Sequence, residues 1–101
     1  MSDLRDRYLA CWNATDADAR RGLLAEHWAE DAAYVDPLVQ IAGLDAVGAT
    51  IAAVHQQFPG FVFTAVGPVD AHHDVARFGW GLGPAGAEPV VAGFDVVATG
   101  A

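Results

Sequence analysis

Hydrophobic residues recur at helical spacing in the first part of the chain. Leu4, Tyr8, Cys11 and Trp12 share one helical face and predict a first helix that ends near Asn13. Because they share this apolar face, we expect Tyr8 and Trp12 to face the interior from the same helix. A polar, loop-like stretch follows the helix.

Two further helices are expected before the chain reaches residue 60. Thr15 or Asp16 can serve as the N-cap of the second helix, which we expect to end by Asp31. Asp45 can cap a third helix over residues 46–57, and the Pro-Gly pair that follows ends it.

Strand-like alternation replaces the helical period after residue 60. Segments 61–69, 75–82 and 90–99 predict three strands joined by short turns, which make an antiparallel meander. Segments 32–36 and 39–41 predict a short hairpin earlier in the chain. The predicted helices precede most of the predicted strands along the chain. This order indicates a single domain with an α+β fold, in which helices cover one face of a curved sheet.

Composition narrows the classes of function. Thirteen acidic and five basic residues give a net charge of −8, which repels nucleic acids and anionic membranes. The N-terminus lacks the apolar run of a signal peptide, and no apolar segment is long enough to cross a bilayer. Cys11 is the only cysteine, so a reducing compartment is the simpler expectation. We therefore predict a cytoplasmic protein that binds neither nucleic acid nor membrane.

The most informative residue is Asp95, which interrupts the apolar segment 90–98. Both faces of a strand with this composition are apolar, so the carboxyl group points at apolar surroundings whichever face carries it. A buried carboxylate without partners is costly, and it escapes that cost by staying protonated or by finding a hydrogen-bond donor. Groups of this kind handle protons.

Two other residues supply complementary chemistry. Asp36 precedes a proline and can be either a turn residue or a proton acceptor. Tyr8 can be either a core tyrosine or a hydrogen-bond donor to a substrate. An ionised carboxylate, a neutral carboxylic acid and a phenol together could remove a proton next to a carbonyl and stabilise the resulting oxyanion.

Three motifs resemble a known family. They are Asp-Arg-Tyr-Leu-Ala-Cys-Trp-Asn-Ala-Thr-Asp at 6–16, Tyr-Val-Asp-Pro at 34–37 and Gly-Phe-Asp-Val-Val at 93–97. They are similar to ketosteroid isomerases and SnoaL-like polyketide cyclases of the nuclear transport factor 2-like fold. The resemblance covers residues 1–101 and implies a cone of three helices over a curved antiparallel sheet. The family's last strand is not found in the sequence, so we expect either that a second copy covers the open sheet edge in a homodimer, or that the sequence is a truncated form with impaired activity.

The resemblance also implies roles for the three candidates. In an isomerase, Asp36 would shuttle the proton while Tyr8 and a neutral Asp95 stabilise the enolate. Ketosteroid isomerases keep a carboxylic acid neutral so that it can donate such a hydrogen bond. In a polyketide cyclase, Asp95 would act as the acid and base. Either enzyme would need no cofactor and would act on a hydrophobic cyclic molecule. The alternative is a non-catalytic module of the same fold that binds a hydrophobic ligand or dimerises.

Several other side chains are candidates for a substrate pocket. Trp12, Phe63 and Trp80 are the aromatic candidates. Arg77 lies in an apolar strand and is either an exposed residue or the partner of a neighbouring carboxylate such as Asp95. The four histidines do not combine with acidic residues at a recognisable ligand spacing, so we expect no metal site.

Overall fold

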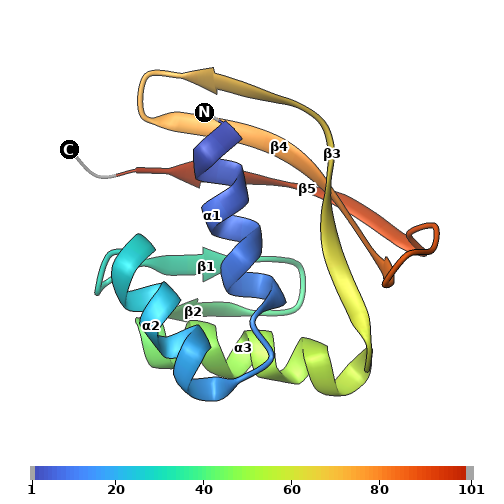
Figure 1. Ribbon diagram of the computed structural model, residues 1–101. Coiled ribbons are helices and arrows are strands. Elements are labelled where there is room, and N and C mark those ends of the chain that lie inside the picture. Colours follow the sequence, from blue (N-terminus) through green and yellow to red (C-terminus); the bar gives the residue numbers. More distant parts are fainter. Residues whose placement is uncertain (1, 100–101) are drawn as a thin grey trace. The chain divides into compact units, whose positions relative to one another are not determined.

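The computed structural model describes residues 2–99, which form three helices and five strands (Figure 1). The helices are α1 (Ser2–Asn13), α2 (Ala17–His27) and α3 (Leu44–Gln57). The strands are β1 (Ala33–Val35), β2 (Gln40–Ala42), β3 (Phe61–His72), β4 (Val75–Pro84) and β5 (Val91–Ala98). The predicted α+β fold of three helices with antiparallel sheets is confirmed. Within residues 2–99, no helix has the length and apolar character needed to cross a membrane.

The chain divides into two compact units. One unit contains α1 and the sheet β3–β4–β5, and the other contains α2, the β1–β2 hairpin and α3. The first unit is built from the two ends of the sequence, so its contacts between α1 and the sheet join residues far apart in the chain. Residues 14–59 form the second unit.

The sheet of the first unit is the predicted antiparallel meander, with β4 in the middle. Phe78 on β4 lies directly opposite Asp95 on β5. The register between β3 and β4 shifts around Gly67, whose φ of 73° is readily adopted only by glycine. Because pairing with β4 resumes after this irregularity, β3 continues past its predicted end at residue 69 and reaches His72. The turn between β3 and β4 is therefore shorter than predicted and consists of residues 73 and 74.

The two faces of this sheet differ in exposure. On the face that meets α1, Phe63, Phe78 and Leu82 are buried. On the opposite face, Phe94 and Val96 are 58% and 59% exposed. Asp95, which alternates with these two residues along β5, is half-buried on the α1 side. Asp95 therefore lies on the face that α1 covers, and α1 does not cover the face that carries Phe94 and Val96.

Two side chains of α1 fasten the helix to β3. The amide of Asn13 donates to the carbonyl of Phe63 (2.9 Å), and the Asn13 side-chain oxygen accepts from the Phe63 N–H (2.7 Å). Near the other end of the helix, Arg5 donates to the carbonyl of Gly67 (2.5 Å). These bonds fix the position of α1 along the strand, and with it the position of Tyr8.

In the second unit, α2 follows the prediction at its start and ends early. Asp16 is its N-cap, and the carboxylate accepts from the N–H of Ala19 (2.9 Å). The helix ends at His27, before the predicted limit at Asp31, because the backbone of Trp28 is extended.

The third helix begins two residues earlier than the sequence indicated. Gly43 occupies its N-cap position with a φ of 92°, and the helix starts at Leu44. Asp45, the predicted cap, instead lies in the first turn, where its charge still interacts favourably with the helix dipole. The predicted hairpin forms as β1 and β2, with Tyr34 opposite Ile41.

Candidate acid–base site

The carboxyl group of Asp95 is held by two donors from the first unit. The hydroxyl of Tyr8 on α1 donates to Oδ2, and the indole Nε1 of Trp80 on β4 donates to Oδ1 (3.2 Å). Tyr8 is buried and Trp80 is half-buried. Of the two ways in which a carboxyl group can tolerate apolar surroundings, the structure therefore shows that Asp95 has found donors.

The position of Trp80 depends on a glycine in the neighbouring strand. Trp80 lies directly opposite Gly93, and a Cβ atom at position 93 would come within 2.7 Å of the indole ring. The absence of a side chain at Gly93 thus lets the indole lie across β5, where its N–H reaches Asp95. Sequence reasoning missed this contact, because only the strand register of the structure places Gly93 opposite Trp80.

Aromatic rings surround the polar groups. Tyr8 contacts Phe78 edge to face (5.2 Å between ring centroids), and Phe63 contacts both Trp12 (5.5 Å) and Trp80 (5.4 Å) in the same manner. The structure therefore brings together five predicted site residues with Phe78, which the sequence did not single out as a site residue. We call the set Tyr8, Trp12, Phe63, Phe78, Trp80 and Asp95 the aromatic–carboxyl cluster.

Arg77 is not part of this cluster. It lies opposite Val96, on the sheet face that points away from Asp95, and its guanidinium stacks over the ring of Phe94 (4.2 Å to the centroid). The pairing with Asp95 that the sequence left open is not formed. Of the two alternatives for Arg77, its position is that of an exposed residue.

Asp36 belongs to the second unit, where it organises the turn between β1 and β2. Its Oδ1 accepts from the N–H groups of Leu38 and Val39 (both 2.8 Å), and its Oδ2 accepts from the hydroxyl of Tyr34 (3.0 Å). Burial raises the pKa of Asp36, but these three hydrogen bonds outweigh that effect and hold the pKa below its ordinary value. The turn role that the sequence allowed for Asp36 is therefore seen directly.

The pair of Tyr8 and Asp95 can exist with one or two protons. With one proton, the phenol donates to the carboxylate, and Asp95 can accept a proton from a bound molecule. With two, the carboxylic acid can donate to the phenol oxygen, which frees the Tyr8 proton for an acceptor on that molecule. Trp80 can only donate, so it holds Oδ1 in both states.

A cavity of about 310 Å³ lies elsewhere, between α2 and α3 of the second unit. Within the described range 2–99, no member of the aromatic–carboxyl cluster lines this cavity. Within the same range, no three His, Cys, Asp or Glu side chains are grouped so as to hold a metal ion.

Comparisons with known proteins place this fold in a family. Residues 6–99 match the family model of the SnoaL-like domain. The chain is 40% identical to a protein from Agrobacterium tumefaciens described as a "putative isomerase of the SnoaL-like family". The TM-score with its crystal structure is 0.91, and the match covers 97% of this chain and 84% of that chain. A comparison with curated proteins gives no match.

Two more distant structures share the fold. One is a "putative polyketide cyclase" from Sinorhizobium meliloti, with 18% identity, a TM-score of 0.73, and coverage of 97% of this chain and 84% of that chain. The other is an NTF2-like protein of unknown function from an Exiguobacterium species, with 21% identity, a TM-score of 0.67, and coverage of 92% and 83%. Because the family model spans almost the whole sequence, and solved relatives share the architecture, the chain belongs to the SnoaL-like family of the nuclear transport factor 2-like fold.

Proposed function

We propose that this protein is an enzyme without a cofactor that moves a proton next to a carbonyl group of a hydrophobic cyclic molecule. The observation that carries the proposal is the carboxyl group of Asp95, set among aromatic rings and held by Tyr8 and Trp80. Membership of the SnoaL-like family and the 40% identity to the Agrobacterium protein support an isomerase. Trp12, Phe63 and Trp80 would supply the apolar contacts to the substrate.

In this mechanism, Asp95 removes a proton from the carbon beside the carbonyl. The electron pair of the broken C–H bond moves to the carbonyl oxygen and forms an enolate. Protonated Asp95 then donates to the Tyr8 oxygen, and the Tyr8 hydroxyl donates to the enolate oxygen. Return of the proton to a different carbon shifts the double bond and restores the carboxylate. Trp80 keeps the carboxyl group aligned throughout.

Asp36 is the second candidate for the proton acceptor. A lowered pKa keeps its carboxylate ionised at neutral pH, which suits an acceptor, but the same three hydrogen bonds reduce its basicity. We therefore assign the proton transfer to Asp95 and treat Asp36 as the alternative that a substitution must exclude.

The test mixes purified protein with a β,γ-unsaturated cyclic ketone and follows conjugation by ultraviolet absorbance. We expect Asp95→Asn to lower kcat by about 10²–10⁴-fold, the usual contribution of general acid–base catalysis. Tyr8→Phe should lower kcat less, and Asp36→Asn should leave it within a few-fold of the wild type. Full activity in Asp95→Asn would overturn the assignment, and a loss confined to Asp36→Asn would transfer the role to that residue.

A polyketide cyclase is the second candidate, favoured by the same placement of a single acid–base carboxyl group. In that reaction the enolate carbon attacks a second carbonyl of the same molecule instead of being reprotonated. Product analysis with aromatic polyketide intermediates separates the two reactions. If a hydrophobic ligand raises the melting temperature but neither substrate turns over, the protein is a binding module and the enzymatic proposal fails.

We also propose that the protein forms a homodimer in the cytoplasm, with its interface on the face of β3–β4–β5 that carries Phe94 and Val96 and not at the sheet edge expected from the sequence. Phe94, Val96 and Val66 lie on this face and expose 58%, 59% and 47% of their surface, and exposed apolar side chains gathered on one face are typical of an interaction site. Arg77 lies on the same face and directly opposite Asp70. Because the patch carries both charges, two copies related by a two-fold axis can pair the cation of one with the anion of the other.

A further inference from the structure

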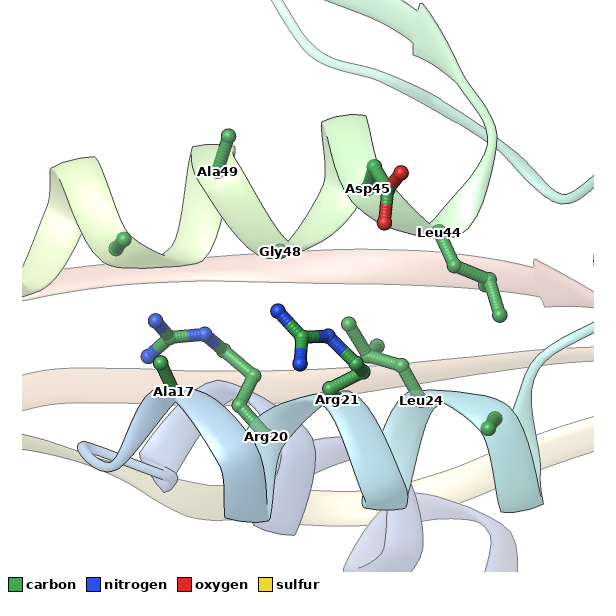
Figure 2. Close-up of a pocket in the computed structure, with 10 residues that line it drawn as sticks. Ala17, Arg20, Arg21, Leu24, Leu44, Asp45, Gly48 and Ala49 are labelled. Carbon is green, nitrogen blue, oxygen red and sulfur yellow. The ribbon is translucent and has the colours of Figure 1, made fainter.

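The cavity between α2 and α3 is lined by three charged side chains, those of Arg20, Arg21 and Asp45, and otherwise by small or apolar residues (Figure 2). Figure 2 shows the guanidinium groups of Arg20 and Arg21 extending from α2 toward α3. Leu24 and Leu44 lie toward the other end, and Gly48 lies on the side of α3 that faces α2. At about 310 Å³, the cavity has the size of a small-molecule site.

Arg20 is the residue that points to a ligand. Its side chain is buried (8% exposed), and its Nη1 donates to the carbonyl of Ala14 (2.9 Å). Among the acidic side chains that the structure describes, none forms an ion pair with Arg20, although the chain has 13 acidic residues and 5 basic ones. A guanidinium carries five N–H donors and pairs well with an anion. Among the described residues, no Arg20 nitrogen is both buried and without a hydrogen bond, so the donors not used by Ala14 are accessible. The position of Arg20 in the cavity wall offers the remaining donors to a bound group.

Arg21 adds a second cation at the mouth of the cavity. Its side chain is 75% exposed and pairs only loosely with Asp18 (3.5 Å), whose side chain is 91% exposed. An ion pair in this setting contributes little and is easily exchanged for another anion. Together the two guanidinium groups can bind both oxygens of one carboxylate.

The rest of the cavity selects the kind of anion. Leu24, Leu44 and the small residues of α3 present carbon atoms, so a fully polar anion would leave this part unfilled. Asp45 also lines the cavity, and its charge disfavours a second negative group on the ligand. These features fit a molecule with one carboxylate and a short aliphatic chain.

We propose that the cavity between α2 and α3 binds an aliphatic monocarboxylate. Its carboxylate accepts hydrogen bonds from Arg20 and Arg21, and its alkyl chain lies along Gly48 toward Leu24 and Leu44. The site uses only residues of the second unit and is independent of the proposed chemistry at Asp95.

The test titrates sodium octanoate into the ¹⁵N-labelled protein and follows the amide resonance of Gly48 and the side-chain resonances of the arginines. Sodium phosphate and octanol are the comparison probes, because each retains only half of the proposed ligand. We expect saturable shifts with octanoate, and affinities at least about tenfold weaker for the other two. Equal binding of phosphate or of octanol would overturn the proposal, as would the absence of saturable shifts with octanoate.

Gly48 provides a variant that fills the cavity and is expected to fold. A Cβ atom at position 48 would lie 3.6 Å from Leu24, an ordinary contact, and replacing glycine within a helix favours the helix. We expect Gly48→Leu to melt no lower than the wild type and to lose octanoate binding. Arg21→Gln should weaken binding severalfold, whereas Asp95→Asn should leave it unchanged. If Gly48→Leu binds octanoate as the wild type does, the ligand occupies another site and the proposal is wrong.

Discussion

At the scale of single residues, Gly93 sets the geometry of the aromatic–carboxyl cluster. A Cβ atom at this position would meet the Trp80 indole at 2.7 Å, closer than packed carbon atoms come. We predict that Gly93→Ala displaces the indole, breaks its hydrogen bond to Asp95 and lowers the free energy of unfolding by about 1–3 kcal/mol. Urea unfolding measures the loss, and tryptophan fluorescence reports the displacement.

Gly22 supplies the matched control for this substitution. It lies within α2, and a Cβ atom there would have no neighbour within 4 Å. Gly22→Ala should therefore raise the free energy of unfolding by about 0.5–1 kcal/mol through helix propensity alone. If Gly93→Ala is as stable as the wild type and has the same fluorescence, the glycine does not create the space for Trp80.

Asp36 makes stability depend on pH. Burial raises its pKa, but the hydrogen bonds from Leu38, Val39 and Tyr34 lower it more, so the carboxyl is more acidic in the folded chain than in the unfolded one. Such a group stabilises the fold above the unfolded pKa, ~3.9 for aspartate, and this contribution is lost as the pH falls through the folded value.

The prediction for Asp36 compares the wild type with Asp36→Asn by urea unfolding from pH 7 to pH 3. We expect the variant to be less stable by about 1 kcal/mol at pH 7, because charge-assisted hydrogen bonds become neutral ones. The difference should begin to shrink below about pH 4 and keep shrinking as the pH falls toward the lower pKa of the folded carboxyl, because the wild-type group takes up its proton over this range. A difference that stays constant over this range would show that the charge of Asp36 adds no stability.

At the scale of elements, periodicity predicted which segments are helices and strands, and local backbone geometry decided where they end. The alternation after residue 60 indicated all three long strands. It could not reveal that the irregularity at Gly67 lets β3 continue to His72, or that Gly43, with its positive φ, lets α3 start before Asp45. These shifts depend on φ values that glycine tolerates, and a hydrophobic pattern does not encode them.

The attachment of α1 to β3 gives a prediction at this scale. Asn13 both donates to and accepts from the backbone of Phe63, so Asn13→Ala removes two hydrogen bonds and leaves a part-buried N–H without its acceptor. We expect it to lower the free energy of unfolding by about 1–3 kcal/mol and to weaken the Tyr8 contact with Asp95 by loosening the helix.

Asn13→Asp is the control, since its carboxylate can still accept from the Phe63 N–H but cannot donate to the carbonyl. Its free energy of unfolding, measured in urea, should lie between those of the wild type and Asn13→Ala. Equal stability of all three proteins would show that the two hydrogen bonds do not hold α1 on the sheet.

At the scale of the whole molecule, the hydrogen bond between Tyr8 and Asp95 spans 87 positions of the sequence. No local pattern could predict that contact, and only the resemblance of three separate motifs suggested that these residues act together. The side of the sheet on which Arg77 lies was also undecided until the strand register placed Phe78, and not Arg77, opposite Asp95. Register fixes the face of every side chain in a strand, and composition alone does not.

The uncovered sheet face gives the prediction that concerns the whole molecule. Val96 is 59% exposed on that face, whereas Leu38, in the β1–β2 turn, is 92% exposed and belongs to the second unit. If the face joins two copies, Val96→Asp places a buried charge at the interface and should convert a dimer to a monomer. Leu38→Asp removes more exposed apolar surface and should leave the dimer intact. Sedimentation velocity distinguishes these outcomes, and a wild type that sediments as a monomer, or equal dissociation of both variants, would contradict an interface on this face.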